Sequence, residues 1–219
     1  MNIAIDGPAG AGKSTIARKL AKEMGFIYVD TGAMYRAMAL YVLERNMDPS
    51  QEAAVCEACD AVDISIRYQN GEQQVLLNGE NVTGKIRSEE VGKTASCISA
   101  YANIRKKLVL LQQKLAADED VIMDGRDIGT CVLPYAEVKI YLTASVTARA
   151  GRRYDELREK GQMCDRKEIQ KDIEDRDYRD MHRKESPLKQ AEDAVLVDSS
   201  DLTVEQVIRE IQKICQERQ

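Results

Sequence analysis

The chain has 219 residues, of which 43% are hydrophobic and 32% charged, and its formal net charge is −5. This length suits one globular domain with a sizeable core, and the composition is that of a soluble protein. The acidic balance argues against a broad nucleic-acid or membrane surface, and no apolar run is long enough to span a bilayer. We therefore expect small-molecule partners, with neither nucleic acid nor a membrane among them.

The cysteines and the first residues of the chain both favour a cytoplasmic location. The six cysteines lie at positions 56, 59, 97, 131, 164 and 215. Such scattered cysteines in a chain of ordinary size are typical of free thiols in a reducing compartment. The segment that starts at Met1 has no basic region followed by an apolar stretch, so we expect no signal peptide.

Along the chain, short apolar runs alternate with longer amphipathic stretches, a pattern that predicts an α/β fold with a parallel sheet flanked by helices. Strands are predicted at Asn2–Asp6, Phe26–Asp30, Val121–Asp124, Val138–Leu142 and Ala194–Asp198. Helices are predicted at Lys13–Met24, Ala33–Arg45, Asn103–Ala117, Val146–Glu159, Lys167–Arg183 and Thr203–Glu217. Because the five strands are short and mostly apolar, we expect them to be buried on both faces.

The segment from about Asp63 to Val82 interrupts this alternation. It is rich in apolar residues on both sides of Gln69-Asn70-Gly71-Glu72, and a second Asn-Gly pair follows at Asn78-Gly79. Asn-Gly between such runs is a strong hairpin signal. We therefore predict a small antiparallel β insertion at about residues 57–95, introduced by a helical stretch near Gln51–Ala61, within a single domain spanning residues 1–219.

A glycine-rich motif follows the first predicted strand and opens the first predicted helix. Residues 7–14 match the P-loop pattern G-x-x-x-x-G-K-[ST]. Glycines let backbone N–H groups point at phosphates, and the helix N-terminus adds a favourable dipole. We expect Lys13 near the β- and γ-phosphates and Ser14 on Mg²⁺. The predicted ATP site comprises Gly7, Pro8, Ala9, Gly10, Ala11, Gly12, Lys13, Ser14 and Thr15.

Arginine-containing loops after the second and third predicted strands indicate a second anion. They read Asp30-Thr31-Gly32-Ala33-Met34-Tyr35-Arg36 and Asp124-Gly125-Arg126-Asp127-Ile128-Gly129. Ligands of open α/β sheets bind at the carboxyl ends of the strands, so both loops should face the P-loop. Phosphoryl transfer requires charge neutralisation, which arginine supplies through paired hydrogen bonds. The pattern therefore favours a kinase, and the lack of an Asn-Lys-x-Asp motif weakens a GTPase.

A third group of charged residues has a helical spacing. Arg176, Asp180 and Arg183 lie at i, i+4 and i+7 and would share one face of a helix. They are either phosphate ligands or part of a solvated helix surface held by ion pairs worth ~0.2–0.5 kcal/mol each.

These motifs together resemble those of bacterial-type cytidylate kinases, a family of P-loop nucleoside monophosphate kinases. The resemblance covers nearly the whole chain and also includes Asn81-Val82-Thr83-Gly84-Lys85-Ile86-Arg87, Val138–Leu142 and Arg176–Asp180. It implies transfer of the γ-phosphate of ATP to CMP or dCMP with Mg²⁺, a step of pyrimidine metabolism. It further implies a monophosphate-binding region at about residues 31–105 and a lid at about residues 151–165. A monomer is expected, because such a kinase must open and close.

The resemblance also implies roles for individual residues. The cytosine edge would be read by Thr31, where the family often has serine, with Arg105 and Asp127, and the acceptor phosphate held by Arg36, Arg126 and Arg183 beside Tyr35. Asp180 would touch the ribose, Arg176 would lie between the two phosphates, and Arg152 and Arg153 would belong to the lid. The catalytic set would be Lys13, Arg126, Arg152, Arg153 and Arg176, without a general base, because the acceptor phosphate is already an oxyanion.

The Asp127 and Arg105 pair favours cytosine on chemical grounds. The exocyclic amine of cytosine donates to Asp127, while Arg105 donates to N3 and O2. Uracil would place an oxygen opposite the carboxylate, a mismatch that costs ~1–3 kcal/mol and corresponds to a roughly tenfold to hundredfold preference. UMP, AMP and a non-nucleotide such as shikimate remain alternative acceptors within the same reaction class.

Other readings are weaker. A regulatory module that uses ATP as a switch would carry a basic face or a long switch segment, and the sequence shows neither. Cys56 and Cys59 form a lone CxxC, for which packing in a helix is favoured over a metal or redox role, because structural zinc needs four ligands. His182, the only histidine, is expected at the surface, and Met34 and Met38 in the packing of a helix. Gly151 and Gly161 flank the predicted lid as candidate hinges.

Overall fold

The computed structural model describes residues 1–218, which form two compact units. Unit 1 comprises residues 1–26 and 120–218, and unit 2 is the continuous segment Ile27–Glu119. The predicted monophosphate-binding region, residues 31–105, falls within unit 2, whereas the P-loop and the predicted lid belong to unit 1. That these parts form one catalytic domain stays a prediction.

The central sheet is the predicted five-stranded one, with the strand order β2-β6-β1-β7-β8. Its strands are β1 (Asn2–Asp6), β2 (Ile27–Asp30), β6 (Val121–Gly125), β7 (Val138–Thr143) and β8 (Val195–Asp198). β1 pairs in parallel with both β6 and β7, and β8 pairs in parallel with β7. The interior strands are buried on both faces as predicted, but β8 is an edge strand, and its Leu196 is 55% exposed. The expectation of full burial is therefore wrong for β8, and also for β2, the other edge strand, in which only Val29 and Asp30 are buried.

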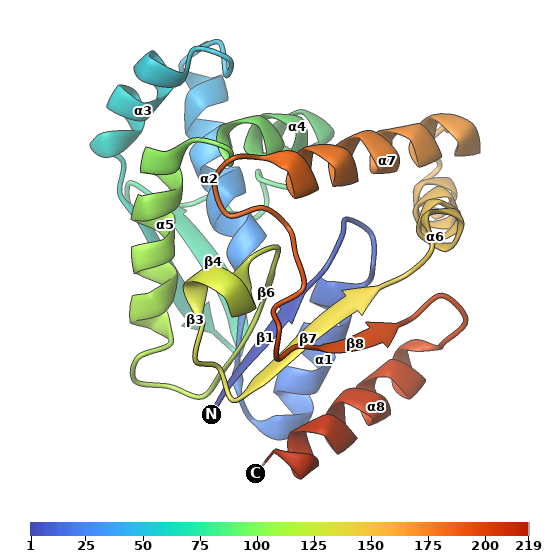
Figure 1. Ribbon diagram of the computed structural model, residues 1–219. Helices are drawn as coiled ribbons and strands as arrows, with labels where there is room; N and C mark the ends of the chain where they lie inside the picture. The colour runs from blue at the N-terminus through green and yellow to red at the C-terminus, as the bar shows by residue number, and fades with distance from the viewer. Residues whose placement is uncertain (219) are drawn as a thin grey trace. The chain divides into compact units, whose positions relative to one another are not determined.

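The helices of unit 1 are α1 (Lys13–Met24), α6 (Val146–Glu159), α7 (Arg166–His182) and α8 (Val204–Glu217), with a short π-helix, η1 (Ile128–Val132). α1 packs on β6 and α8 on β7, and the two helices lie side by side (Figure 1). α8 begins with a capping box in which Thr203 and Gln206 satisfy each other's backbone N–H groups. α6 and α7 pack together beyond the carboxyl ends of β1 and β7, close to the P-loop.

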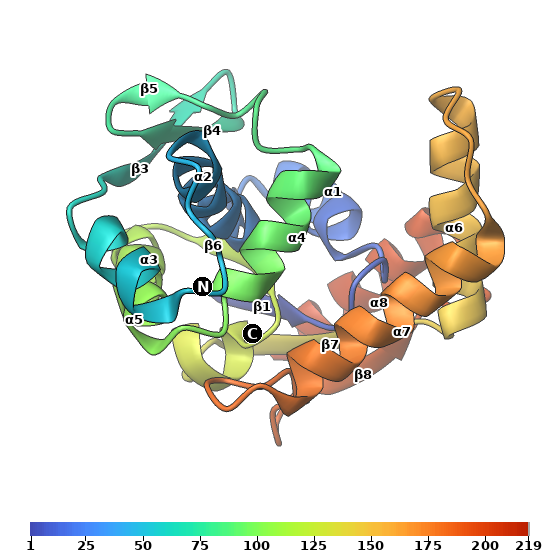
Figure 2. The same cartoon turned by 90° about the horizontal axis from the view of Figure 1, so that it is seen from above.

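Unit 2 combines a helical layer with a small antiparallel sheet. Its elements besides β2 are α2 (Thr31–Glu44), α3 (Glu52–Asp60), β3 (Ile64–Gln69), β4 (Glu72–Leu77), β5 (Glu80–Asn81), α4 (Glu89–Ile98) and α5 (Ala102–Leu115). The sheet has the order β3-β4-β5, and β4 packs against α2 (Figure 2). Both turns of the sheet are Asn-Gly pairs with positive φ, 54° and 78° for Asn70 and Gly71 and 50° and 84° for Asn78 and Gly79. These values are those of type I′ turns, which confirms the predicted hairpin.

The predicted ends of helices and strands agree with the structure to within two residues, but two helices were not predicted. α4 begins at the cap Ser88, whose hydroxyl accepts from the Val91 N–H, and Glu89 and Glu90 follow in its first turn. These are ordinary helix-start signals. They were not recognised because α4 lies directly beside the β insertion. The π-helix η1 has no sequence signal and depends on contacts from β1.

Candidate active site

The P-loop has a backbone that only glycine allows at two positions. Gly7 has φ +150°, and a Cβ there would lie 1.9 Å from the carbonyl oxygen of Leu142. Gly12 has φ +90° and caps the N-terminus of α1, where its carbonyl accepts from the Ile16 N–H at 3.0 Å. The sequence therefore forms the predicted phosphate-binding turn between β1 and α1.

Lys13 and Ser14 are the first two residues of α1, directly after Gly12. The Lys13 side chain is buried, and its Nζ donates to the carbonyl oxygen of Pro8 at 2.8 Å, so the ammonium folds back over the loop. Ser14 Oγ donates to Asp124 Oδ2 at 2.8 Å. Asp124 ends the buried part of β6, and its role was not predicted, although its place at the end of a strand next to the P-loop was a usable signal.

Two of the predicted phosphate ligands, Arg126 and Arg176, lie near Lys13, together with Asp180. Burial and the neighbouring Arg126 guanidinium hold the pKa of Lys13 well below its usual value, and Arg176 acts in the same direction. Arg126 Nε donates to Asp180 Oδ2 at 2.8 Å. Burial alone would raise the pKa of Asp180, but Arg126 and Arg176 reverse this effect and hold it below its usual value. A concentration of positive charge that lowers a lysine pKa is suited to binding anions.

The helix that carries Arg176 and Asp180 is not the solvated surface considered above. Asp180 is only 5% exposed and pairs with Arg126 from another element, so the solvated alternative is wrong for this residue. The predicted helix end at Arg183 is one residue late, because α7 ends at His182 and Arg183 follows as an extended cap. Arg183 Nη2 lies 3.5 Å from Asp127 Oδ1, and Arg183 Nε donates to the Ser186 carbonyl at 2.8 Å.

A buried ion pair between α6 and α7, which was not predicted, contacts the P-loop. Arg149 Nη2 lies 2.6 Å from Asp177 Oδ2, and Arg149 Nη1 donates to the carbonyl oxygen of Ala9 at 2.8 Å. The N–H of Ala9 in turn points at Asp177 Oδ1, at 3.4 Å. Both residues are less than 10% exposed. The pair therefore holds both polar groups of one P-loop residue, and no local sequence pattern marks it because Arg149 and Asp177 lie on different helices.

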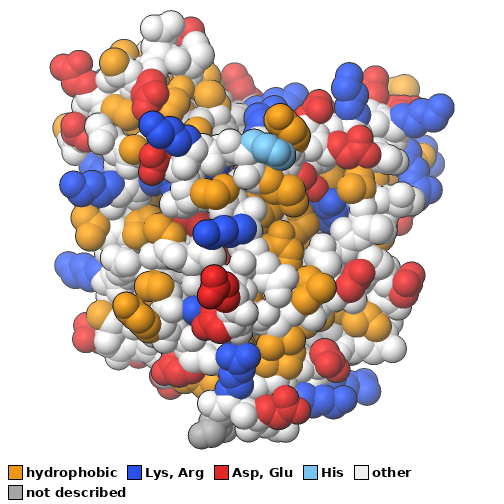
Figure 3. Space-filling model, viewed as in Figure 1, with side chains coloured by type: hydrophobic (Ala, Val, Ile, Leu, Met, Phe, Trp, Pro, Cys, Tyr) orange, Lys and Arg blue, Asp and Glu red, His pale blue; other side chains and the backbone are white. Residues whose placement is uncertain are grey.

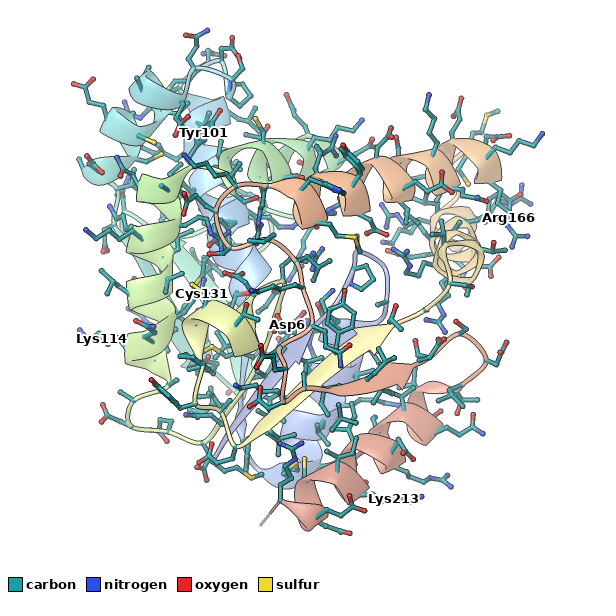
Figure 4. The ribbon with its side chains drawn as sticks, in the orientation of Figure 1. Asp6, Tyr101, Lys114, Cys131, Arg166 and Lys213 are labelled. Atoms are coloured by element: carbon teal, nitrogen blue, oxygen red, sulfur yellow. The ribbon has the colours of Figure 1, made fainter. Side chains whose placement is uncertain are left out.

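Asp6 is a second buried carboxylate that was not predicted. It ends β1 beside η1, the helix on which Cys131 lies (Figure 4). Its Oδ1 accepts from the Ile128 N–H at 2.8 Å and its Oδ2 from the Gly129 N–H at 2.7 Å. Burial raises the pKa of Asp6 to about 6, although these two bonds act to lower it.

This raised pKa predicts a pH dependence of stability. Between about pH 4 and pH 6 the folded chain keeps the proton on Asp6 while the unfolded chain has lost it, so this group's contribution to stability falls as the pH rises. The free energy of unfolding of the wild type minus that of Asp6→Asn should therefore decrease from pH 4 to pH 7. Urea unfolding of both proteins across this range measures the difference. A difference that stays constant or grows with pH contradicts the assignment.

Unit 2 carries the other part of the predicted acceptor site, beginning at the start of α2. The Asp30 carboxylate caps α2 by accepting from the Ala33 N–H at 3.0 Å, and Arg87 Nη2 lies 2.7 Å from its other oxygen. Gln73 of β4 accepts from the Asp30 N–H at 2.8 Å and donates to its carbonyl oxygen at 3.2 Å. These bonds fix the turn that precedes Thr31, which is 3% exposed. The helix therefore begins two residues before its predicted start.

The remaining predicted residues of unit 2 lie along α2 and α5. Tyr35 follows Thr31 by one helical turn, and the Arg105 guanidinium lies 5.6 Å from the centre of the Tyr35 ring. Arg105 Nη1 also donates to the Ser99 carbonyl at 3.1 Å, and the residue is 4% exposed. Arg36 Nη1 donates to the Ile86 carbonyl at 3.3 Å. The structure thus brings Tyr35 and Arg105 together within unit 2, as it brings Lys13, Arg126, Arg176 and Asp180 together within unit 1.

The predicted lid consists of the later turns of α6 and the segment up to α7. Arg152 donates to the Oγ and the carbonyl of Ser199, and Arg153 Nη1 lies 2.8 Å from Glu156 Oε2 on the same helix. Gly161 follows α6 with φ +70°, a conformation that suits a bend. Gly151, by contrast, lies inside α6, and a hinge at either glycine stays a prediction.

Several other residues have the places expected of them. Met34 and Met38 are fully buried in unit 2, and Cys56 and Cys59 are buried in α3, where burial raises the pKa of Cys59 to about 11. Within residues 1–218, no group of three or more His, Cys, Asp or Glu side chains could hold a metal ion. His182 lies at the surface, stacked on Tyr178 with ring centres 4.0 Å apart (Figure 3). None of the helices in this described part is long and apolar enough to cross a membrane.

Comparison with known proteins identifies both close relatives and structural neighbours. The family model described as Cytidylate kinase matches residues 3–217. A cytidylate kinase of Lactobacillus johnsonii is 50% identical over 219 residues, which cover 100% of this chain and 95% of the relative. One of Caldicellulosiruptor saccharolyticus is 52% identical over 211 residues, covering 96% and 93%.

Among solved structures, a shikimate kinase from Bacteroides thetaiotaomicron matches with a TM-score of 0.51 at 14% identity, covering 99% of this chain and 98% of that one. A gluconokinase from Sinorhizobium meliloti matches with a TM-score of 0.50 at 10% identity, covering 99% and 93%. At such identities the two structures support the P-loop kinase fold and nothing about the acceptor.

Proposed function

Since the chain belongs to the cytidylate kinase family, we propose that it transfers the γ-phosphate of ATP to CMP and dCMP, giving ADP and CDP or dCDP. The observation that carries this proposal most directly is the grouping of Lys13, Arg126, Arg176 and Asp180 in unit 1. It combines a phosphate loop with two further cations and a carboxylate able to accept from a ribose hydroxyl. A kinase whose acceptor is itself a phosphate monoester requires such a combination.

ATP is proposed to bind with its phosphates on the backbone N–H groups of residues 7–15 at the N-terminus of α1. Lys13 would then leave the Pro8 carbonyl and turn to the β- and γ-phosphates. The negative charge of the phosphates offsets the repulsion between Lys13 and Arg126, so bound ATP favours the charged form of the lysine.

Mg²⁺ fits the donor chemistry beside the P-loop. Ser14 and Asp124 supply a hydroxyl and a carboxylate oxygen next to each other, and magnesium prefers oxygen ligands together with substrate phosphates. These two residues would hold the ion. When bound, Mg²⁺ neutralises charge on the phosphates.

The residues proposed for the acceptor are those predicted from the sequence. Arg36, Tyr35, Arg126 and Arg183 are assigned to the CMP phosphate. Thr31, Arg105 and Asp127 are assigned to the base, with Asp180 on the ribose. Arg176, and Arg152 and Arg153 from the lid, would neutralise charge between the two phosphates as the lid closes and excludes water. Because Arg126 and Asp180 are already paired, the ligand would find a guanidinium and a carboxylate fixed before it binds.

The reaction and the base assignment can be tested in one assay of ADP release with Mg-ATP and CMP, dCMP, UMP or AMP. We expect kcat/KM for CMP to exceed that for UMP by roughly tenfold to hundredfold, because uracil would place an oxygen atom next to the Asp127 carboxylate. Asp127→Ala should remove most of this difference by raising the KM for CMP.

The control for this assay is Glu205→Gln, because Glu205 is a 60%-exposed carboxylate of α8 that pairs with Lys19 at the surface. It should retain wild-type selectivity. Equal rates with CMP and UMP in the wild type would be consistent with kinase activity but would refute the base assignment. If no monophosphate gave a measurable rate, the acceptor would have to be a compound other than a nucleotide. A protein that used ATP only as a switch would show no rise in turnover when a monophosphate is added.

A further inference from the structure

We propose that Asp6 is a positioning residue for base selection, which holds the turn of Asp127 in place from the end of β1. This inference rests on the proposed assignment of Asp127 to cytosine. It gives a role to a buried carboxylate outside the set assigned to ATP and CMP.

The geometry of the contact supports this role. The two oxygens of Asp6 accept from two successive amides, those of Ile128 and Gly129, at 2.8 and 2.7 Å. These amides directly follow Asp127 in the chain. Two bonds from one carboxylate to adjacent N–H groups fix both the position and the rotation of the peptide between them. The start of the turn is therefore set by β1 and not by the turn itself.

The π-helix that follows explains why an outside acceptor is required. The first N–H groups of any helix lack an acceptor within the helix, and η1 begins at Ile128 without a side-chain cap of its own. Its later amides return to the Asp127 carbonyl, which accepts from Cys131 and Val132 at 2.9 and 3.2 Å. Asp6 therefore satisfies the amides that the short helix leaves open, and the backbone of Asp127 is held from both sides.

The side chains packed around the turn leave its backbone little room to move. Asp6 is 4% exposed, and a Cβ built on Gly129 would lie 3.1 Å from Lys139 Cδ and 3.4 Å from Asp6 Oδ2. Lys139 is itself fixed, because its Nζ donates to the Pro134 carbonyl at 2.6 Å and pairs with Asp193. A substitution at Asp6 is therefore expected to shift the backbone of the turn, because the neighbouring side chains cannot move to compensate.

The test compares Asp6→Asn with wild type, with Asp127→Asn and with the control Glu205→Gln. An asparagine at position 6 keeps one acceptor but presents an N–H₂ group to the second amide, so one bond is lost and a donor faces a donor. We expect the CMP-to-UMP ratio of kcat/KM to fall about five- to tenfold through a higher KM for CMP, with the KM for ATP within about twofold of wild type. Hydrogen exchange at the Ile128 and Gly129 amides should become faster. Glu205→Gln should behave as wild type.

Each outcome bears on the proposal. If Asp127→Asn loses selectivity while Asp6→Asn retains it, the positioning role is wrong and the base assignment stands. If Asp127→Asn keeps wild-type selectivity, the base assignment fails and this proposal fails with it. If Asp6→Asn raised the KM for ATP and the KM for CMP equally, the substitution would be acting through the P-loop, and the proposal would be overturned. Should Asp6→Asn not fold, Gly129→Ala displaces the same turn from its other side, because the new Cβ would lie 3.1 Å from Lys139 Cδ, and it must lower the ratio in the same direction.

Discussion

Replacing Lys13 with methionine is expected to lower kcat by about 10²- to 10³-fold, a loss of roughly 3–4 kcal/mol of transition-state stabilisation. Methionine keeps most of the length and apolar character of the side chain but removes the charge. The protein should remain folded, because in the absence of ATP the buried ammonium is disfavoured by burial and by Arg126. The measurement is the steady-state rate with saturating Mg-ATP and CMP, with circular dichroism to confirm the fold.

Lys19→Met is the matched control for this prediction. Lys19 lies on the same helix, is 49% exposed and pairs with Glu205 at the surface. Its loss should change kcat by less than about twofold, since an exposed ion pair contributes ~0–1 kcal/mol. If Lys13→Met kept more than about a tenth of the wild-type rate, the proposed role of the lysine in transition-state stabilisation would be refuted.

Asp177→Asn is expected to have the largest effect on stability. It leaves the Arg149 guanidinium, which is 4% exposed, without its counter-charge. Breaking a buried pair from one side costs ~3–5 kcal/mol. For a chain of this length, this corresponds to a fall in Tm of about 6–20 °C. Thermal unfolding followed by circular dichroism measures the shift in Tm. Bound ATP should restore only part of the lost Tm, because Arg149 and Asp177 contact the P-loop in the unliganded chain as well.

Two further variants separate the ion pair from a general effect of the substitution. Glu156→Gln makes the same acid-to-amide change at an exposed pair of α6, with both side chains about half exposed, and should lower Tm by no more than about 4 °C. The double variant Arg149→Met with Asp177→Leu should recover much of the stability, because removal of both charges leaves none buried alone. A Tm of Asp177→Asn within about 2 °C of wild type would show that the pair is not a stabilising contact.

Much of the fold followed from local patterns in the sequence. The strands β1, β6 and β7 are short apolar runs between charges, and this is how strands buried on both faces read. The β insertion followed from Asn70-Gly71 and Asn78-Gly79, since Asn-Gly tolerates the positive φ that type I′ turns require. The edge position of β8 could not be predicted, because strand order depends on which strands pair and not on the composition of one strand.

The site was predictable where a motif is continuous and not where residues meet across elements. The turn between β1 and α1, with Lys13 at the start of the helix, was predictable because the whole pattern lies within eight residues. Arg126 was found from its loop, but its bond to Asp180 joins residues 54 positions apart. Asp6 and the Arg149–Asp177 pair were missed for the same reason: their partners are backbone groups or side chains distant in sequence. No single-sequence pattern encodes such contacts, although a buried charge always requires one.

The division of the chain between the units has a consequence for its synthesis on the ribosome. Unit 2 is one uninterrupted stretch, whereas β1 pairs only with β6 and β7, which begin at Val121 and Val138. At ~5–20 residues per second, roughly 6–24 s separate the translation of β1 from that of its first partner. During this interval the apolar strand and the P-loop emerge without a sheet to join, while unit 2 can already fold. Unit 2 is therefore expected to fold before the N-terminal segment does. Until β6 and β7 have been made, β1 is the segment that most needs protection from aggregation.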